Sequence, residues 1–248
     1  MGEASQKKIL IVIPTYNEKE NIENLIRQIL DRYLPEAHIL VIEDNSPDGT
    51  GQIVDRLVVS NPQVHVVHRS GKLGFGSAYK MAFHWGLDQG FDVIYQMDAD
   101  FSHDPPYLRP FFDEIKGDAY DGVIGSRYVS GGGTEDWGIL REIISRGGGI
   151  YTRLLLGTSV RDMTGGFNAW SRKLLEGIDF DQIKSEGFSF QIELKYRAWK
   201  RGFRLKEYPI VFKDRFLGKS KMSSKIFKEA IWRVAVIGVT DKIGLARY

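Results

Sequence analysis

Short apolar runs alternate with amphipathic segments through the first half of the chain. Runs this short and continuous predict strands that are covered on both faces, as in a parallel sheet. The runs are Ile9–Ile13, Ile39–Ile42, Val64–Val67, Val93–Met97 and Gly122–Ile124.

The segment after the first run has the spacing of an amphipathic helix. Its apolar residues recur three or four positions apart, at Ile22, Leu25, Ile26, Ile29 and Leu30. Asn17 is the predicted N-cap, with Glu20 placed three residues on to complete a capping box. The repeated order of strand, helix and strand predicts a doubly wound α/β fold, which binds its ligands beyond the carboxyl ends of the strands.

The pattern changes after about Tyr128. A glycine run, Gly131–Gly133, opens a segment rich in arginine, glycine and aromatic residues. A further strand is predicted at Leu205–Phe212, and the last predicted element is an amphipathic helix over 226–237. The absence of repeats and clear linkers favours one catalytic domain over residues 1–218, followed by a basic amphipathic extension over 219–248.

The composition excludes several kinds of site. The 248 residues include no cysteine, which excludes disulfides, cysteine-ligated metals and a thiolate nucleophile. Only five apolar residues precede Pro14 after the first lysines, so no signal peptide is expected. No apolar stretch reaches the ~18 residues of a spanning helix, since the late run Ile231–Val239 has nine residues and includes Arg233.

Charge is distributed unevenly along the chain. Residues 195–248 hold fifteen Lys or Arg against four Asp or Glu, whereas the preceding residues hold nineteen against twenty-eight. A basic tail on an acidic body predicts contact with an anionic surface, either a membrane leaflet or nucleic acid. A lysine-rich solvated surface is the alternative, and the 226–237 helix could equally pack on the core.

Carboxylates follow three of the predicted strands. They occur in Pro14-Thr15-Tyr16-Asn17-Glu18, in the segment from Glu43 to Thr50, and in Asp98-Ala99-Asp100. In a parallel sheet these strand ends meet, and their like charges require a compensating cation. Oxygen ligands favour Mg²⁺ or Mn²⁺ over zinc. A solvated turn is the alternative for the acidic triplet taken alone.

The combination of motifs is more specific than any one of them. The segments IVIPTYNE, EDNSPDGT, QMDADFSHDPP, VIGSRYVSGGG, RDMTGGFNAWSR, GFSFQIEL and KDRFLGKSK span most of residues 8–225. In this order they resemble the family 2 glycosyltransferases of GT-A fold, and most of all the dolichol-phosphate (polyprenyl-phosphate) mannose synthases. The resemblance implies inverting transfer of mannose from GDP-mannose to dolichyl or polyprenyl phosphate, the activity of EC 2.4.1.83.

The resemblance also implies site residues on the donor side. The residues that it places around the nucleotide sugar are Pro14, Tyr16, Glu18, Ile42, Asp44, Asp98, Ala99, Arg215 and Lys221. Asp98 and Asp100 would hold Mg²⁺ or Mn²⁺, with Ser102 standing where many relatives have a glutamine ligand. His103 next to them is more typical of a packing or hydrogen-bonding residue than of a metal ligand.

On the acceptor side, the resemblance assigns catalytic roles to Asp100, Arg127, Arg141 and Ser145. The arginines would grip phosphate with their planar forks, although Arg141 could instead pair with Glu142 or Asp136 at the surface. The D-x-T-G-x-F stretch, from Asp162 to Phe167, would lie near the acceptor. The loop carrying Arg215, Gly218 and Lys221 would close over the diphosphate, with a plain solvent loop as the alternative.

The implied partners are GDP-mannose, polyprenyl or dolichyl phosphate, and an anionic membrane surface on the cytoplasmic face, with no role for nucleic acid. A small transmembrane partner subunit is also consistent with the family. Three alternatives remain: a polyprenyl-phosphate glucosyltransferase, a related enzyme using another sugar, and a non-catalytic membrane-docking scaffold. A dinucleotide-dependent oxidoreductase is disfavoured, because no G-x-G-x-x-G follows the first strand.

Overall fold

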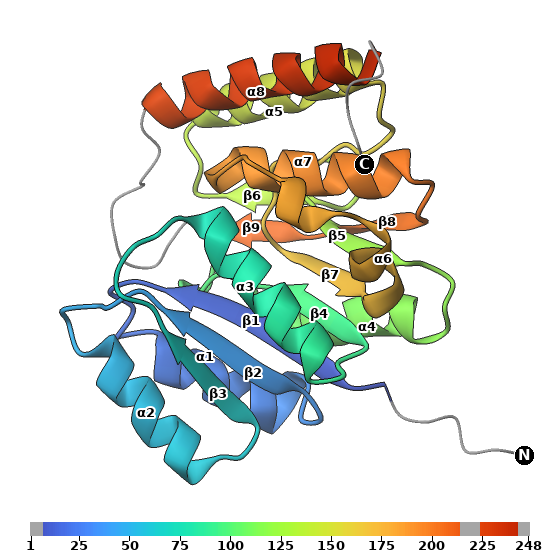
Figure 1. Ribbon diagram of the computed structural model, residues 1–248. Helices are drawn as coiled ribbons and strands as arrows, with labels where there is room; N and C mark the ends of the chain where they lie inside the picture. The colour runs from blue at the N-terminus through green and yellow to red at the C-terminus, as the bar shows by residue number, and fades with distance from the viewer. Residues whose placement is uncertain (1–6, 214–223, 243–248) are drawn as a thin grey trace, which may run out of the picture.

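The computed structural model describes residues 7–213 and 224–242, in which helices cover both faces of a seven-stranded sheet (Figure 1). The strand order is β3-β2-β1-β4-β7-β5-β8. The five apolar runs are confirmed as strands: β1 Ile9–Thr15, β2 His38–Glu43, β3 Val64–His68, β4 Val93–Gln96 and β5 Gly122–Ser126. Apart from β3, in which only Val64 is buried, these strands are buried almost throughout. This burial explains why the sequence identified them, because a strand covered on both faces has no polar alternation.

The sheet is mostly parallel, which confirms the predicted fold class. Strands β1 to β4 pair in parallel, and β5 pairs in parallel with β8, Leu205–Pro209. One strand that the sequence did not reveal, β7 at Asn168–Ser171, runs antiparallel between β4 and β5. Its residues, Asn-Ala-Trp-Ser, do not form an apolar run, so the sequence carried no strand signal there.

The single strand expected over Leu205–Phe212 is wrong. The chain leaves the main sheet after Pro209, and β9, Val211–Lys213, pairs instead with β6, Gly133–Glu135. Ile210 joins the two sheets, since its N–H donates to Ser126 O and its carbonyl accepts from the N–H of Gly133. This change of partner places the β9 segment beside the loop that follows β5.

The predicted cap at Asn17 is also wrong. The first helix, α1, spans Ile22–Gln28 and continues as a π-helical turn over Ile29–Tyr33. Asn17 has a φ of 59°, and its N–H donates to Ser46 Oγ. The loop after β2 also receives the next two N–H groups, through Thr50 and Asp48. Tertiary contacts have therefore replaced the local cap.

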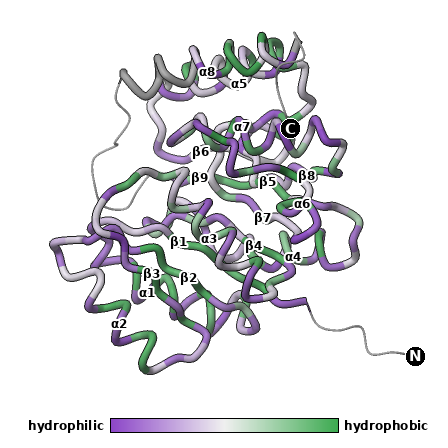
Figure 2. Tube along the Cα trace, in the orientation of Figure 1, coloured by the Kyte–Doolittle hydropathy of each residue, from purple (hydrophilic) through white to green (hydrophobic). Residues whose placement is uncertain are grey.

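The remaining helices cover the two faces of the sheet. They are α2 Thr50–Ser60, α3 Phe75–Asp88, α4 Leu108–Lys116, α6 Arg172–Gly177 and α7 Gly187–Lys200, with 3-10 turns at Pro105–Tyr107 and Phe180–Gln182. The apolar core divides into one cluster on the α3 and α7 side and another beneath α1, α2 and α4. Hydrophobic residues line β2 in Figure 2.

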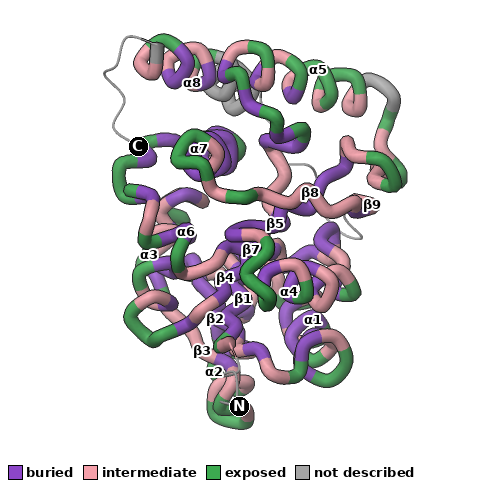
Figure 3. The backbone as a smooth tube through the Cα atoms, turned by 90° about the vertical axis from the view of Figure 1, so that its right-hand side faces the viewer, coloured by how far each residue is buried: buried purple, intermediate pink, exposed green. Residues whose placement is uncertain are grey.

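Two long helices form an outer layer over α7. Helix α5, Ile139–Leu156, lies beside α8, Ser224–Lys242, and α8 also contacts α7 (Figure 1). Val234 and Ile237 of α8 are buried in this packing. Exposed turns follow one another along α5, whereas the central strands are buried (Figure 3). No helix within the described residues is long and apolar enough to cross a membrane.

Candidate active site

The acidic triplet forms a tight turn at the carboxyl end of β4. Asp100 is only 6% exposed, and its Oδ1 accepts hydrogen bonds from the main-chain N–H of Ser102 at 3.2 Å and from Ser102 Oγ at 2.6 Å. Asp98 is more open, with 34% of its side chain exposed. Phe101, between Asp100 and Ser102, adopts a left-handed φ of 60°, which reverses the chain and brings Ser102 back to Asp100.

His103 supports this turn through a hydrogen bond to its main chain. Its Nδ1 accepts from the main-chain N–H of Asp98 at 2.9 Å, and its ring stacks on Phe167 with centroids 4.9 Å apart. Burial lowers the pKa of His103 to about 4, so the ring is neutral at physiological pH. With Nδ1 engaged and the ring stacked, His103 is a hydrogen-bonding and packing residue in this structure.

The oxygen atoms of this turn suit a hard divalent cation. Two carboxylates, from Asp98 and Asp100, lie with the Ser102 hydroxyl on one short loop, and Mg²⁺ and Mn²⁺ both prefer such donors. Within residues 7–213 and 224–242, no group of three or more acidic, histidine or cysteine side chains forms a metal cluster. Substrate oxygens and water would therefore have to complete the coordination of an ion held here.

An arginine that the sequence analysis missed fixes the carboxylate after β2. Arg69 donates to both oxygens of Asp44, from Nε at 2.5 Å and from Nη2 at 2.6 Å. Its other hydrogen bonds reach Ser77 Oγ and Gly74 O, so it ties Asp44 to the start of α3. Arg69 directly follows strand β3, and this position at a strand end was the available signal.

The other predicted donor-side residues divide into two groups. Pro14 near the end of β1, and Tyr16 and Glu18 just after it, are partly exposed. Lys72 Nζ lies 4.9 Å from the ring centroid of Tyr16. The side chains of Ile42 and Ala99, in contrast, are 0% and 3% exposed and belong to the core. Any contact from these two residues to a nucleotide would have to come from the main chain.

On the acceptor side, Arg127 forms a buried ion pair. Its Nε and Nη2 each lie 2.7 Å from one carboxylate oxygen of Asp162, and Nη2 also donates to Thr164 Oγ1 at 2.9 Å. The two side chains are 7% and 0% exposed. Burial alone would raise the pKa of Asp162, but the adjacent Arg127 lowers it to about 2. The fork that was expected to meet phosphate is thus directed at a carboxylate.

Arg141 and Ser145 lie on α5, close to this pair. Both arginines contact the indole of Trp137: Arg141 Cζ is 4.1 Å from its ring centroid and Arg127 Cζ is 5.4 Å from it. Ser145 Oγ is 2.5 Å from the hydroxyl of Tyr128. Arg127 Cζ also lies 5.2 Å from the ring centroid of Tyr128, so these contacts bring Arg127, Arg141 and Ser145 into one cluster.

One aromatic ring connects the acceptor side to the acidic turn. Phe212 of β9 has its ring centroid 5.5 Å from that of Trp137 and 5.9 Å from that of His103. The two halves of the expected site are therefore neighbours. Arg215, Gly218 and Lys221, the expected lid residues, lie outside the described residues.

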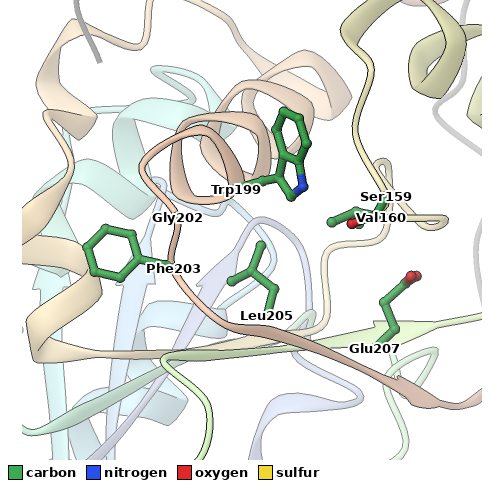
Figure 4. A pocket seen from close by; sticks show the side chains of 7 residues that line it. All are labelled: Ser159, Val160, Trp199, Gly202, Phe203, Leu205 and Glu207. Atoms are coloured by element: carbon green, nitrogen blue, oxygen red, sulfur yellow. The ribbon is translucent and has the colours of Figure 1, made fainter.

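A cavity of about 330 Å³ lies on a different part of the molecule. It is formed where the loop after α5 meets the end of α7 and strand β8 (Figure 4). None of the predicted site residues contributes to it. Its lining residues are Ser159, Val160, Trp199, Gly202, Phe203, Leu205 and Glu207.

Known proteins resemble the chain in both sequence and fold. It is 43% identical to polyprenol monophosphomannose synthase of Mycolicibacterium smegmatis, over 97% of this chain and 91% of that protein. It is 42% identical to undecaprenyl-phosphate mannosyltransferase of Micrococcus luteus, over 95% of this chain and 96% of that protein. Glucosyl-3-phosphoglycerate synthase from Mycobacterium tuberculosis, solved with Mn²⁺ and UDP-glucose, matches with a TM-score of 0.65 at 19% identity, covering 98% of this chain and 81% of that one.

The structural match supports the fold alone, whereas the sequence matches confirm the resemblance that the motifs indicated. Residues 10–179 match the family described as glycosyl transferase family 2. This range includes β1 to β5, the acidic turn and the Arg127–Asp162 pair. The chain is a glycosyltransferase, and it belongs to glycosyl transferase family 2.

Proposed function

We propose that the chain transfers mannose from GDP-mannose to a polyprenyl phosphate, with inversion at the anomeric carbon and with Mg²⁺ or Mn²⁺ as cofactor. The observation that carries this proposal is the identity of 42–43%, over nearly the whole chain, to two proteins named for mannose transfer to polyprenyl carriers. The juxtaposition of an acidic turn and an arginine cluster supports it, because the reaction joins two phosphate-bearing substrates.

The proposed chemistry needs no general base. A phosphate monoester with a second pKa of about 6 is already mostly ionised at neutral pH, so its oxygen can attack the anomeric carbon directly. The bond from that carbon to the diphosphate oxygen breaks, and the nucleoside diphosphate leaves. A divalent cation held by Asp98 and Asp100 would neutralise the charge that develops on this leaving group.

The protein's own residues would position the two anions. Arg141, half-buried and with its Cζ 4.1 Å from the ring centroid of Trp137, would contact the acceptor phosphate. Arg127 would act mainly by holding that cluster together, because its Nε and Nη2 already donate to Asp162. Tyr16 and the Asp44–Arg69 pair would hold the nucleoside on the other side of the acidic turn.

We propose that the enzyme works at a membrane surface, because the proposed acceptor has a lipid tail, and that the outer helix layer is the contact. Helix α5 exposes Ile143, Ile150 and Leu154, which are 61%, 56% and 81% exposed. Trp232 of the neighbouring α8 is 69% exposed. The sequence pattern predicted this contact in the 219–248 extension alone, whereas α5 adds an apolar face to it. Apolar faces flanked by basic residues bind anionic lipid surfaces.

This contact can be tested with a matched pair of variants. Leu154→Glu should weaken co-sedimentation with anionic vesicles by about ten- to a hundredfold, the effect of losing one buried leucine. Val59→Glu is the control, because Val59 is 91% exposed but lies on α2, away from the outer layer. Equal binding by both variants would contradict the proposed surface. The cytoplasmic face and a small transmembrane partner remain part of this proposal.

The activity is tested by supplying a panel of nucleotide sugars with polyprenyl phosphate. GDP-mannose should give polyprenyl phosphate mannose of inverted anomeric configuration, measured by mass spectrometry and NMR. The Asp100→Ala variant is the inactive control. Preferential use of UDP-glucose would identify a glucosyltransferase instead, and the absence of product with every donor would favour the non-catalytic scaffold.

A further inference from the structure

A lysine is buried beside the acceptor side of the site. Lys195 of α7 is 0% exposed, and its Nζ donates to Asp162 O at 2.8 Å and to Gly165 O at 2.7 Å. These two carbonyls belong to one turn of the loop before β7. Lys195 therefore joins the middle of a core helix to the segment that carries the partner of Arg127.

The same helix supports that turn a second time. Gln191 lies one helical turn before Lys195, so both side chains share one face of α7. Its Oε1 accepts from Asn168 Nδ2 at 3.1 Å, and Asn168 Nδ2 also approaches Gly165 O at 3.3 Å. Helix α7 thus reaches the turn over residues 162–166 directly through Lys195 and indirectly through Gln191, by way of Asn168.

Strand β8 holds the turn from the opposite direction. The carboxylate of Glu207, seen on the wall of the cavity in Figure 4, accepts the main-chain N–H groups of Arg161 and Asp162, each at 2.9 Å. Within the turn, the N–H of Gly165 donates to Asp162 Oδ1 at 2.9 Å. The turn is therefore fixed on both sides and by its own carboxylate.

The turn lies where the donor and acceptor halves meet. At one end Asp162 holds Arg127, and at the other Gly166 approaches the acidic turn so closely that a Cβ there would lie 3.3 Å from His103 Cε1. Gly165 is equally confined, because a Cβ there would lie 3.3 Å from Gly125 O. Small displacements of this turn would therefore alter the spacing between the two phosphate-binding sides.

Burial of a lysine is unfavourable in itself. Desolvation lowers the pKa of Lys195 to about 8, although the neighbouring carboxylate of Asp162 favours the charged form. An apolar side chain of similar length would avoid this penalty. Retention of an amine here is explained if its hydrogen bonds hold the turn in one position.

We propose that Lys195, assisted by Gln191, is a positioning residue that sets the Asp162–Gly166 turn and, through Asp162, the position of Arg127, so that Arg141 meets the acceptor phosphate in line with the donor sugar. This inference rests on the proposed function. Lys195 would touch neither substrate and would act through the two carbonyl groups that it binds.

The expected signature is a selective loss on the acceptor side. Lys195→Met removes the lysine donor from both carbonyls, leaving Gly165 O only its longer contact with Asn168 Nδ2, and removes one charge beside Asp162. A shift of the turn by about 1 Å would then lower turnover on the order of a hundredfold, and the KM for polyprenyl phosphate should rise. The dissociation constant of GDP with Mn²⁺ should change less than about twofold, because Asp44 and Arg69 lie on the far side of the acidic turn.

The experiment compares Lys195→Met, Lys195→Arg and Gln191→Leu with wild type in the full chain. Lys200→Met is the control on the same helix, because Lys200 is 42% exposed and pairs with Asp241 at the surface. For each protein, kcat and the KM values for GDP-mannose and polyprenyl phosphate are measured. GDP binding is measured as well, and thermal unfolding gives the fraction of folded protein. Lys195→Arg, which restores a charged donor, should recover part of the loss.

Four results separate the outcomes. Wild-type kcat and acceptor KM in folded Lys195→Met would overturn the inference, as would a loss that matches the folded fraction alone. If Lys195→Met does not fold, Gln191→Leu decides, and an unchanged acceptor KM in that variant would overturn the inference. A wild-type chain that transfers no sugar would instead refute the proposed function, and the inference with it.

Discussion

The buried pair of Arg127 and Asp162 allows a quantitative prediction about stability. Arg127→Met would leave the carboxylate of Asp162 in the interior without its cation. Asp162→Asn would leave the guanidinium of Arg127 there without its carboxylate. Breaking a buried pair in this way costs about 3–5 kcal/mol. In a domain of this size, each kcal/mol lowers the Tm by about 2–4 °C, so each variant should unfold roughly 6–20 °C below wild type.

The double variant distinguishes a true pair from two independent contributions. With both charges removed, the desolvation penalty disappears, so the double variant should be less destabilised than the sum of the single variants by at least about 2 kcal/mol. Urea denaturation followed by circular dichroism at pH 7 measures all four proteins. Additive effects, or an Asp162→Asn variant within about 1 kcal/mol of wild type, would refute the reasoning.

The pH dependence of unfolding provides an independent check on the same pair. The folded-state pKa of Asp162, about 2, lies below its ordinary value of 3.8. Its contribution to stability is therefore complete above pH 3.8 and is lost as the pH falls from 3.8 through 2. A difference of this size corresponds to on the order of 2 kcal/mol. Asp162→Asn should lack this part of the acid limb.

Three further predictions concern the reaction and the membrane contact. Asp100→Ala should abolish turnover while leaving the fold intact, and EDTA should inactivate the wild-type chain until Mg²⁺ or Mn²⁺ is added back; full activity in excess EDTA would contradict the metal site. Arg141→Ala should lower turnover by about ten- to a hundredfold with little change in Tm, and Arg141→Lys should recover only part of it, because it lacks the planar fork. Binding to anionic vesicles should weaken as salt is added, since each basic residue contributes about 1 kcal/mol that salt screens; binding that ignores both salt and lipid charge would contradict the surface.

The sequence alone predicted the elements whose signals are local. The first five strands are built around short apolar runs, interrupted in β3 by His65, and burial on both faces favours such runs. The order of strands and helices then placed the residues after β1, β2 and β4 at one edge of the sheet. The motifs at these strand ends were themselves specific enough to indicate the family.

Signals that depend on a distant partner were misread or missed. Asn17 looked like a helix cap, but Ser46 on another loop takes its N–H. Strand β7 has no apolar run that would mark it in the sequence. It is a strand because it pairs with β4 and β5, which lie far from it in the chain. The exposed apolar face of α5 was also missed, since its apolar residues gave no sign of which would remain uncovered.

The electrostatic framework of the site was decided by the tertiary structure alone. Arg69 and Asp44 are 25 residues apart in sequence, Arg127 and Asp162 are 35 apart, and Lys195 lies 33 residues from the carbonyl of Asp162 that it binds. A strand needs only its own apolar residues to be recognised. A buried charge is stable only beside a particular opposite charge or carbonyl, and folding selects that partner from segments far apart in the chain.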